Sequence, residues 1–545
     1  MTKRNDIIVG TIITLFGILW YIDFDTKFTG LDDNLIFDNQ WDKMKDYSYL
    51  VQAFRQNVFL IDGAAYYRPI QTILMMPIPL LTGTPNPYPD YYLYYGIFWM
   101  IITLLTILQF LKVLGFREKY RYLFVSLLTV HPAMVEAVCW SPGNVDLFLT
   151  TFTLWSLIFF IQWRRKGSFI NVVFHLLFWN LALLTKEAAL LFPALFVISS
   201  LLSEDFSAHQ MFKKDGSASF SEILYTLPKN SFRWLWANKL LTVSWIISLL
   251  FWFILRSNTG STDAFSPLIY IDQIPSGFED VLFAIGSMLL PAIPVAMLEV
   301  SWVELLISLP GIILLFYWAW KNKTSTENFS IMIVWLFLTL ITTTVSGYAM
   351  MHRMILPMIG LAFGFSFLNA WIEENPRRVI VYGSIVFIVW GGFNLHFQKD
   401  FGDPFDYWNS IITKSNSESL GYYGLGNSYV NAEDYEKAIK YSRKALALDS
   451  TIYFANIGLA VSYHEIGKYD SAVYYYRKEM EVQQEIYQDC IHFLLGRSLL
   501  KTGKKEEAIQ QLRLGYNCGD QSRHILKIRK QLEDELGMSL NPGED

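Results

Sequence analysis

A long series of apolar segments is the feature that most constrains the fold of this chain. Residues 7–396 hold an excess of hydrophobic side chains, whereas residues 397–545 have the composition of an ordinary soluble protein. Over the whole chain 53% of the residues are hydrophobic and only 17% are charged, and a soluble domain is nearer a quarter charged. The sequence therefore predicts a membrane domain over residues 1–400 and an aqueous domain over residues 401–545.

Many of the apolar segments are long enough to cross a membrane, which takes about 20 mostly apolar residues. We expect about 11 spans, near residues 7–22, 91–112, 121–138, 145–162, 169–185, 188–203, 240–255, 302–320, 329–347, 353–372 and 378–395. Residues 281–300 would be a further span, but Pro291 and Pro294 interrupt them. We expect a re-entrant or interfacial hairpin there. The predicted fold class is all-α, a polytopic membrane helix bundle followed by a soluble helical domain.

The distribution of basic residues predicts how the spans are oriented. Lysine and arginine cluster near residues 112–121, 164–166, 204–239, 321–323 and 376–378, and such clusters mark cytoplasmic loops. Lys3 and Arg4 precede the first apolar segment and no small-residue cleavage site follows it, so we expect an uncleaved first span with a cytoplasmic N-terminus. The first loop and the C-terminal domain then lie outside the cytoplasm.

Charge and cysteine content exclude some classes of function. The net charge of -5 gives no argument for binding nucleic acid. The cysteines Cys139, Cys490 and Cys518 are too few for a disulfide framework and have the wrong spacing for a zinc site. Cys490 and Cys518 can pair if their domain lies in an oxidising compartment, but the sequence alone favours free thiols.

The C-terminal domain contains an internal repeat with a period of 34 residues over 421–480. The residues Leu425, Gly426, Tyr429, Tyr435 and Ala438 recur as Leu459, Ala460, Tyr463, Tyr469 and Ala472, and a third copy gives Leu495, Gly496, Gly503 and Ala508. This pattern resembles tetratricopeptide repeats, in which small residues let two antiparallel helices approach closely. About three repeats are the minimum for a stable stack, and residues 522–538 would add a capping helix. The repeats predict helix packing, and they suggest a concave surface for a peptide.

Ionisable residues gather at the expected outer ends of the membrane helices. They are Arg68, His131, Glu136, Asp146, Lys186, Glu187, Arg256, His352 and Arg353, and the first outer loop adds the adjacent acids Asp32 and Asp33. Charged groups at membrane depth are costly and usually face a cavity, so this convergence indicates a functional site. Structural roles are the alternative. Lys186 and Glu187 can form an ion pair at a helix junction, His131 can cap a helix, and Asp146 can favour a helix dipole.

The motifs and their order resemble one family. An N-terminal helix and a paired acid are followed by "YYRPI", "HPAMVEAVCWSPGNVDLF", "LLTKEAAL" and "HRMILPMIG", and then by tetratricopeptide repeats. This arrangement resembles the TMTC-type protein O-mannosyltransferases and their bacterial relatives, within the GT-C glycosyltransferase superfamily. Two positions depart from the family pattern, because Asn144 stands where an arginine is usual and His352 where a glutamate is usual.

The resemblance implies a transferase that moves a sugar from a polyprenyl-phosphate-linked donor to Ser or Thr hydroxyls of exported proteins, guided by the repeats. It implies Asp32 or Asp33 as general base, with inversion at the anomeric carbon, and it implies groups for the leaving phosphate at Arg353, Arg256, Lys186 and Arg68. Residues for the sugar or the acceptor would be His131, Glu136, Trp140, Asn144, Asp146, Glu187 and His352. Some members of the superfamily use a divalent metal, but no spacing here is typical of a metal site. The short repeat array suits a bacterial inner-membrane protein whose repeats face the periplasm.

Two other functions fit parts of the sequence. The same membrane site could transfer the sugar to a glycolipid or another cell-envelope acceptor, although the repeats suit a protein acceptor better. A non-enzymatic membrane scaffold with a repeat docking arm predicts charges near the membrane midplane and internal symmetry of the helices. The charges instead lie at the outer ends of the expected spans, which favours the transferase.

Overall fold

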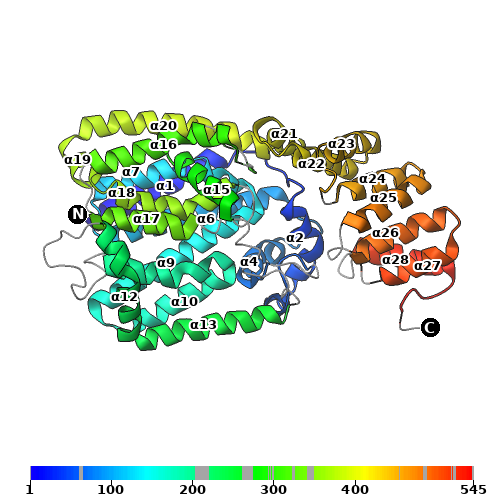
Figure 1. Ribbon diagram of the computed structural model, residues 1–545, viewed down its shortest axis with the longest axis horizontal. Helices are drawn as coiled ribbons and strands as arrows, with labels where there is room; N and C mark the ends of the chain where they lie inside the picture. Colours follow the sequence, from blue (N-terminus) through cyan, green and yellow to red (C-terminus); the bar gives the residue numbers. More distant parts are fainter. Residues whose placement is uncertain are drawn as a thin grey trace.

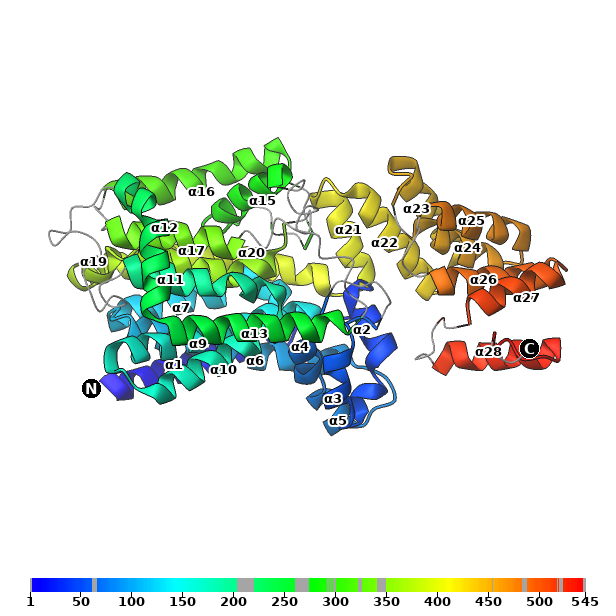
Figure 2. The same ribbon diagram turned by 60° about the horizontal axis from the view of Figure 1, so that its bottom comes forward.

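Helices make up nearly all of the chain that the structure describes. The computed structural model describes residues 2–60, 66–202, 220–259, 274–291, 294, 296–297, 300–321, 326–340, 349–452, 454–482, 488–516, 518 and 523–542. In Figures 1 and 2 a bundle of long helices carries the repeat helices at one end, and the N-terminus lies at the opposite end. The fold is therefore all-α, as the sequence predicts.

The helices of the bundle fall into two groups along the chain. The first group is α1 (Thr2–Tyr21), α2 (Asp32–Gln40), η1 (Lys43–Lys45), α3 (Tyr49–Gln52), η2 (Ala53–Arg55), α4 (Pro69–Met75), α5 (Pro77–Thr82), α6 (Pro89–Val113), α7 (Glu118–Thr129), α8 (Ala133–Cys139), η3 (Ser141–Gly143), α9 (Asn144–Lys166), α10 (Phe169–Thr185), η4 (Glu187–Leu191) and α11 (Phe192–Leu202). The second group is α12 (Phe220–Ala237), α13 (Lys239–Ser257), α15 (Ile274–Ser287), α16 (Trp302–Lys321), α17 (Thr326–Leu340), η6 (Met351–Met354), α18 (Ile355–Gly364), α19 (Leu368–Glu374), α20 (Pro376–Gln398), η7 (Lys399–Phe401) and α21 (Pro404–Lys414).

Several of these helices suggest a membrane protein by their length and composition. Within the described residues four are long and apolar enough to cross a bilayer, namely Pro89–Val113, Ser141–Lys166, Lys239–Ser257 and Pro376–Phe401. Two bent pairs raise the number to six if each pair is one span, namely Glu118–Thr129 with Ala133–Cys139 and Met351–Gly364 with Leu368–Glu374. The structure thus shows 4 to 6 candidate spans, and the larger expected number stays a prediction.

Two segments differ from the sequence prediction. Helix α12 occupies much of the expected loop 204–239, because Leu227 and Trp234 lie seven residues apart on one helix face and pack against the core. Residues 203–219 of that loop lie outside the described part. In the apolar stretch 281–300, helix α15 ends at Ser287, and no helix continues through the described residues as far as Ser301.

The described parts of the basic segments that were predicted on one side of the membrane gather at one end of the bundle. The Asp6 carboxylate of α1 lies 2.5 Å from the Lys112 ammonium and 3.2 Å from the Arg121 guanidinium. Lys119 pairs with Glu373 at 2.6 Å, which brings the segment before α20 to the same place. This end carries the N-terminus, whereas α2 and the repeat helices lie at the other end (Figure 2).

The C-terminal domain consists of helix pairs that correspond to the predicted repeats. The helices are α22 (Glu418–Asn431), α23 (Tyr435–Leu448), α24 (Ala455–Glu465), α25 (Tyr469–Val482), α26 (Gln488–Lys501), α27 (Lys505–Leu514) and the final helix α28 (Arg523–Leu536). Most of the apolar positions that recur in the sequence are buried, namely Leu425, Ala438, Leu459, Ala460, Ala472, Leu495 and Ala508. The period of the sequence therefore marks the contacts between the paired helices.

A disulfide bond joins Cys490 of α26 to Cys518, with the two Cα atoms 4.6 Å apart. The expectation of free thiols was wrong for this pair, because helix packing brings together two residues that are 28 positions apart in sequence. Cys139 is a buried free thiol.

Replacing Cys490 with Ser is expected to lower the free energy of unfolding of the repeat domain by about 3 kcal/mol, because the crosslink restricts the unfolded chain. Urea unfolding of the full chain, with and without dithiothreitol, measures the effect. The wild type should lose stability in the reductant, and the variant should not respond to it. Equal stability of the oxidised and reduced wild type would contradict the expectation.

Helix α21 connects the bundle to the repeats. Its Trp408 and Ile411 are buried in the same core as the membrane helices. The Trp408 ring lies so close to α22 that a Cβ atom at Gly424 would overlap it, so only glycine fits there. The domain boundary expected near residue 400 is therefore bridged by one shared core.

Candidate active site

The ionisable residues singled out in the sequence converge at the end of the bundle that lies next to the repeats. The start of α2 supplies Asp32, the residue before α4 supplies Arg68, and α8 supplies Glu136. The first turn of α9, the junction between α10 and η4, and η6 supply the other members, namely Asp146, Lys186, Glu187, His352 and Arg353. Six separate elements thus contribute charged groups to one region.

A buried network of two acids, a lysine and a histidine forms the centre of this region. The Lys186 ammonium lies 2.9 and 2.7 Å from the two carboxylate oxygens of Asp146. The imidazole of His352 lies between the two acids, with Nε2 3.4 Å from Asp146 and Nδ1 2.8 Å from Glu136. The backbone N–H of His352 also donates to Oε2 of Glu136 at 2.9 Å. All four side chains are at most 11% exposed.

A second ion pair joins Arg68 to Glu187 at 3.0 Å. The Arg68 guanidinium also stacks on Tyr66 at 4.5 Å. Lys186 and Glu187 therefore do not pair with each other, which overturns the structural alternative drawn from the sequence. Lys186 has an extended backbone (φ -157°, ψ 140°). The side chains of Lys186 and Glu187 therefore point in opposite directions, and each pairs with a different residue.

The two adjacent acids of the first loop have different surroundings. Asp33 is 1% exposed and accepts a hydrogen bond from the Thr29 backbone N–H at 2.6 Å, so it holds the turn before α2. Asp32 faces the charges of Arg68 and Arg353. Burial raises the pKa of Asp32 to about 6, and the two arginines oppose this rise without cancelling it. Asp32 is thus a carboxylate that can exchange a proton near neutral pH.

Trp140 lies beside the network, whereas Asn144 and His131 form contacts that stabilise the fold. The Trp140 ring lies 5.4 Å from that of His352. Asn144 donates to the Ala137 carbonyl at 2.6 Å and thereby fixes the junction of α8 and α9. Nδ1 of His131 accepts from the Ala133 N–H at 3.1 Å, and its ring packs against Trp390 of α20. For His131 the capping role considered from the sequence is the one the structure describes.

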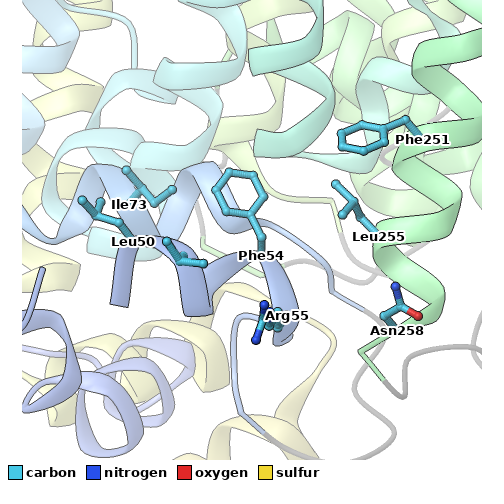
Figure 3. Close-up of a pocket in the computed structure, with 8 residues that line it drawn as sticks. Leu50, Phe54, Arg55, Ile73, Phe251, Leu255 and Asn258 are labelled. Carbon is cyan, nitrogen blue, oxygen red and sulfur yellow. The ribbon is translucent and has the colours of Figure 1, made fainter. Parts of the chain in front are cut away.

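An apolar cavity of about 580 Å³ lies between α3, η2 and α4 on one side and α13 on the other. Its lining consists of Leu50, Val51, Phe54, Arg55, Ile73, Phe251, Leu255 and Asn258. Figure 3 shows Phe251 and Leu255 of α13 across from Phe54 of η2. The Tyr67 hydroxyl donates to the Phe54 carbonyl at 3.1 Å. The centroids of the Tyr67 and Trp252 rings lie 6.4 Å apart.

Arg256 lies at the end of α13, close to this cavity. Its guanidinium is 5% exposed and stacks over Trp252 at 5.3 Å. Tyr67, which contacts Phe54 of the cavity lining, directly precedes Arg68 in the sequence.

Reasoning from the sequence missed one residue of this region, Tyr407 of α21. Its side chain is 1% exposed, and its hydroxyl lies within electrostatic range of Glu136, Asp33 and Asp32. Nothing in its local sequence signals this position, because α21 reaches the acids only through the contact between the two domains. Among the described residues there is no group of three or more His, Cys, Asp or Glu side chains that could hold a metal ion.

Comparison with known families matches residues 421–452 to the tetratricopeptide repeat. No curated protein matches the chain. The C-terminal domain therefore contains a tetratricopeptide repeat, as the period of the sequence predicts. The resemblance of the membrane domain to glycosyltransferases remains a prediction.

Proposed function

We propose that the chain is an integral membrane glycosyltransferase of the GT-C type, with about 11 spans. It transfers a sugar from a polyprenyl-phosphate-linked donor to Ser or Thr hydroxyls of exported proteins. The observation that carries the proposal is Asp32, a carboxylate with a pKa of about 6 that faces Arg68 and Arg353. A proton acceptor next to anion-binding groups is what transfer of a sugar away from a phosphate requires.

In the proposed reaction Asp32 takes the proton of the acceptor hydroxyl while the oxygen attacks the anomeric carbon. The bond between this carbon and the phosphate oxygen breaks, and the polyprenyl phosphate leaves with the electron pair. The configuration at the anomeric carbon inverts, because attack and departure occur on opposite faces. Asp33 positions the loop that carries Asp32, because it holds Thr29 in the preceding turn.

The cations and the apolar cavity support a lipid phosphate as the donor. Arg68 and Arg353 act electrostatically on Lys186, and both also act on Asp32. Such a cluster stabilises the charge that develops on a leaving phosphate. The cavity has mostly apolar walls suited to the first isoprene units, and Arg256 directly follows the lining residue Leu255.

The disulfide and the grouping of basic residues support the proposed orientation. Disulfides persist in oxidising compartments such as the periplasm, and one joins Cys490 to Cys518 in the repeat domain. The basic segments gather at the end that carries the N-terminus, opposite to the repeats. The proposed location is a bacterial inner membrane, with a cytoplasmic N-terminus and periplasmic repeats that guide the acceptor protein.

Glycopeptide mass spectrometry of exported proteins tests the proposal. A deletion strain is compared with the same strain complemented by the wild type at matched expression. Hexose-type additions on Ser or Thr that vanish on deletion and return on complementation would support it. If the glycoproteins are unchanged but a cell-envelope glycolipid loses its sugar, the acceptor is a lipid. If neither the glycoproteins nor the glycolipids change, the result favours a scaffold role.

The proposal predicts how transfer depends on pH. A general base works only when deprotonated, so the transfer rate should rise with pH through about 6 and level off above it, in line with the pKa of Asp32. The pH profile of kcat/KM between about pH 4.5 and 8.5 measures this. In the Arg68→Gln variant the rise should move to higher pH, because Arg68 lowers the pKa of Asp32. A rate that is constant across this range would contradict Asp32 as the base.

A further inference from the structure

Helix α21 leads into the repeats and places one buried hydroxyl next to the acids of the site. The Tyr407 hydroxyl has no hydrogen-bond partner among the described residues. The carboxylates of Glu136, Asp33, Asp32 and Asp400 act on it electrostatically, Glu136 most strongly. Burial, which has the largest effect, and these carboxylates raise the pKa of Tyr407 well above its usual value. The hydroxyl therefore keeps its proton and acts as a hydrogen-bond donor.

Glu136 offers a matching acceptor that is also unsatisfied. One of its oxygens, Oε2, receives the His352 N–H. The other oxygen, Oε1, is buried and has no hydrogen-bond partner in the described part of the chain. Burying an unpaired donor or acceptor costs free energy, so native structures rarely leave either group without a partner. A hydroxyl group satisfies such a pair, because it accepts one hydrogen bond and donates another.

Contacts of Tyr407 and of the next residue in the chain fix this part of α21. The indole N–H of the next residue, Trp408, donates to the Thr29 carbonyl at 3.0 Å, in the turn that Asp33 holds. The Tyr407 ring packs against Phe401 at 5.6 Å. On the far side Trp408 packs against α22 at Gly424. The backbone of α21 at Tyr407 is therefore held by the contacts of Trp408 with the first loop and with the repeats.

We propose that Tyr407 and Glu136 together bind one hydroxyl group of the transferred sugar. The Tyr407 O–H donates to the sugar oxygen, and Oε1 of Glu136 accepts the sugar O–H. This inference rests on the proposed function, in which the single hydroxyl of a Ser or Thr acceptor lies at Asp32. A second hydroxyl must then belong to the sugar, which carries several. A phosphate does not suit this position, because the neighbouring carboxylates would repel it.

The test uses deoxy sugars and the purified full chain. Farnesyl phosphate esters of mannose, glucose, galactose and N-acetylglucosamine are first compared as binding probes by calorimetry. The ester that binds best is then made in mono-deoxy forms, each lacking one ring hydroxyl. Dissociation constants and transfer rates are measured for the wild type, Tyr407→Phe, Glu136→Gln and a control, Tyr476→Phe, whose ring is buried in the core of the repeats.

The wild type should bind one deoxy analogue about 10- to 100-fold more weakly than the parent ester, as expected for losing one well-formed hydrogen-bond pair. Tyr407→Phe and Glu136→Gln should bind the parent ester weakly and should no longer distinguish it from that analogue. A structural defect would instead weaken all analogues alike. Tyr476→Phe should behave as the wild type.

The outcomes separate this inference from the proposed function. If Tyr407→Phe and Glu136→Gln both still bind the parent ester more tightly than the deoxy analogue, by the same factor as the wild type, the proposed hydroxyl site is wrong, whatever the transfer rates are. If the wild type discriminates as expected but transfers no sugar to Ser or Thr, the hydroxyl site stands and the proposed acceptor falls. If the wild type binds none of the esters, both are overturned. Should one variant fail to fold, the other gives the same readout.

Discussion

Replacing Asp32 with Asn is expected to reduce sugar transfer by about 10²- to 10⁴-fold, because an amide cannot take the proton of the attacking hydroxyl. Asp32 is the loop acid whose pKa is raised to about 6 and which faces Arg68 and Arg353. Among the described residues its carboxylate forms no hydrogen bond that holds the fold, and Asn has nearly the same shape. The melting temperature should therefore stay close to that of the wild type while kcat falls. A purified transfer assay and a thermal unfolding curve measure the two quantities.

Two neighbouring acids serve as controls for this substitution. Asp33→Asn should lower the melting temperature as well as activity, since Asp33 accepts the Thr29 N–H at 2.6 Å and is buried. Asp25→Asn should change neither quantity, because Asp25 is exposed in the same loop. Full transfer by Asp32→Asn would show that another group is the base.

The fold was predictable from the sequence where a periodic pattern determines the packing. The period of 34 residues places Leu425 and Leu459 in equivalent buried positions, so the sequence alone locates the repeats. The number of spans was harder to predict, because the length of an apolar run does not show where a helix breaks. Between α7 and α8, for example, the chain bends by 60° at the His131-Pro132 step.

The composition of the site was predictable, but its pairing was not. The sequence indicated that Asp146, Lys186 and Glu187 belong to one region. It could not show that Lys186 pairs with Asp146 and Glu187 with Arg68, because these contacts depend on backbone direction and on helices distant in sequence. The sequence did not indicate Tyr407 for the same reason, because only the packing of α21 brings this residue into the range of Glu136 and the acids of the first loop.

Replacing Lys186 with Met is expected to lower the free energy of unfolding by about 3–5 kcal/mol, because it leaves the carboxylate of Asp146 buried without its ammonium partner. The pair is well shielded, with side chains 11% and 8% exposed. Lys119→Met is the matched control at the opposite end of the bundle. Its pair with Glu373 is 54% and 35% exposed, so this change should cost less than about 1 kcal/mol. Chemical unfolding in detergent compares the three proteins.

The double variant Lys186→Met/Asp146→Asn separates folding from chemistry. It should regain most of the lost stability, since neither charge of the pair is left buried alone. Transfer should nevertheless stay low, because the positive charge that would stabilise the leaving phosphate is still missing. If the double variant is as unstable as the single one, the lysine stabilises the fold through contacts other than the ion pair. If it transfers sugar at the wild-type rate, Lys186 does not act on the donor phosphate, and that task falls to Arg68 and Arg353.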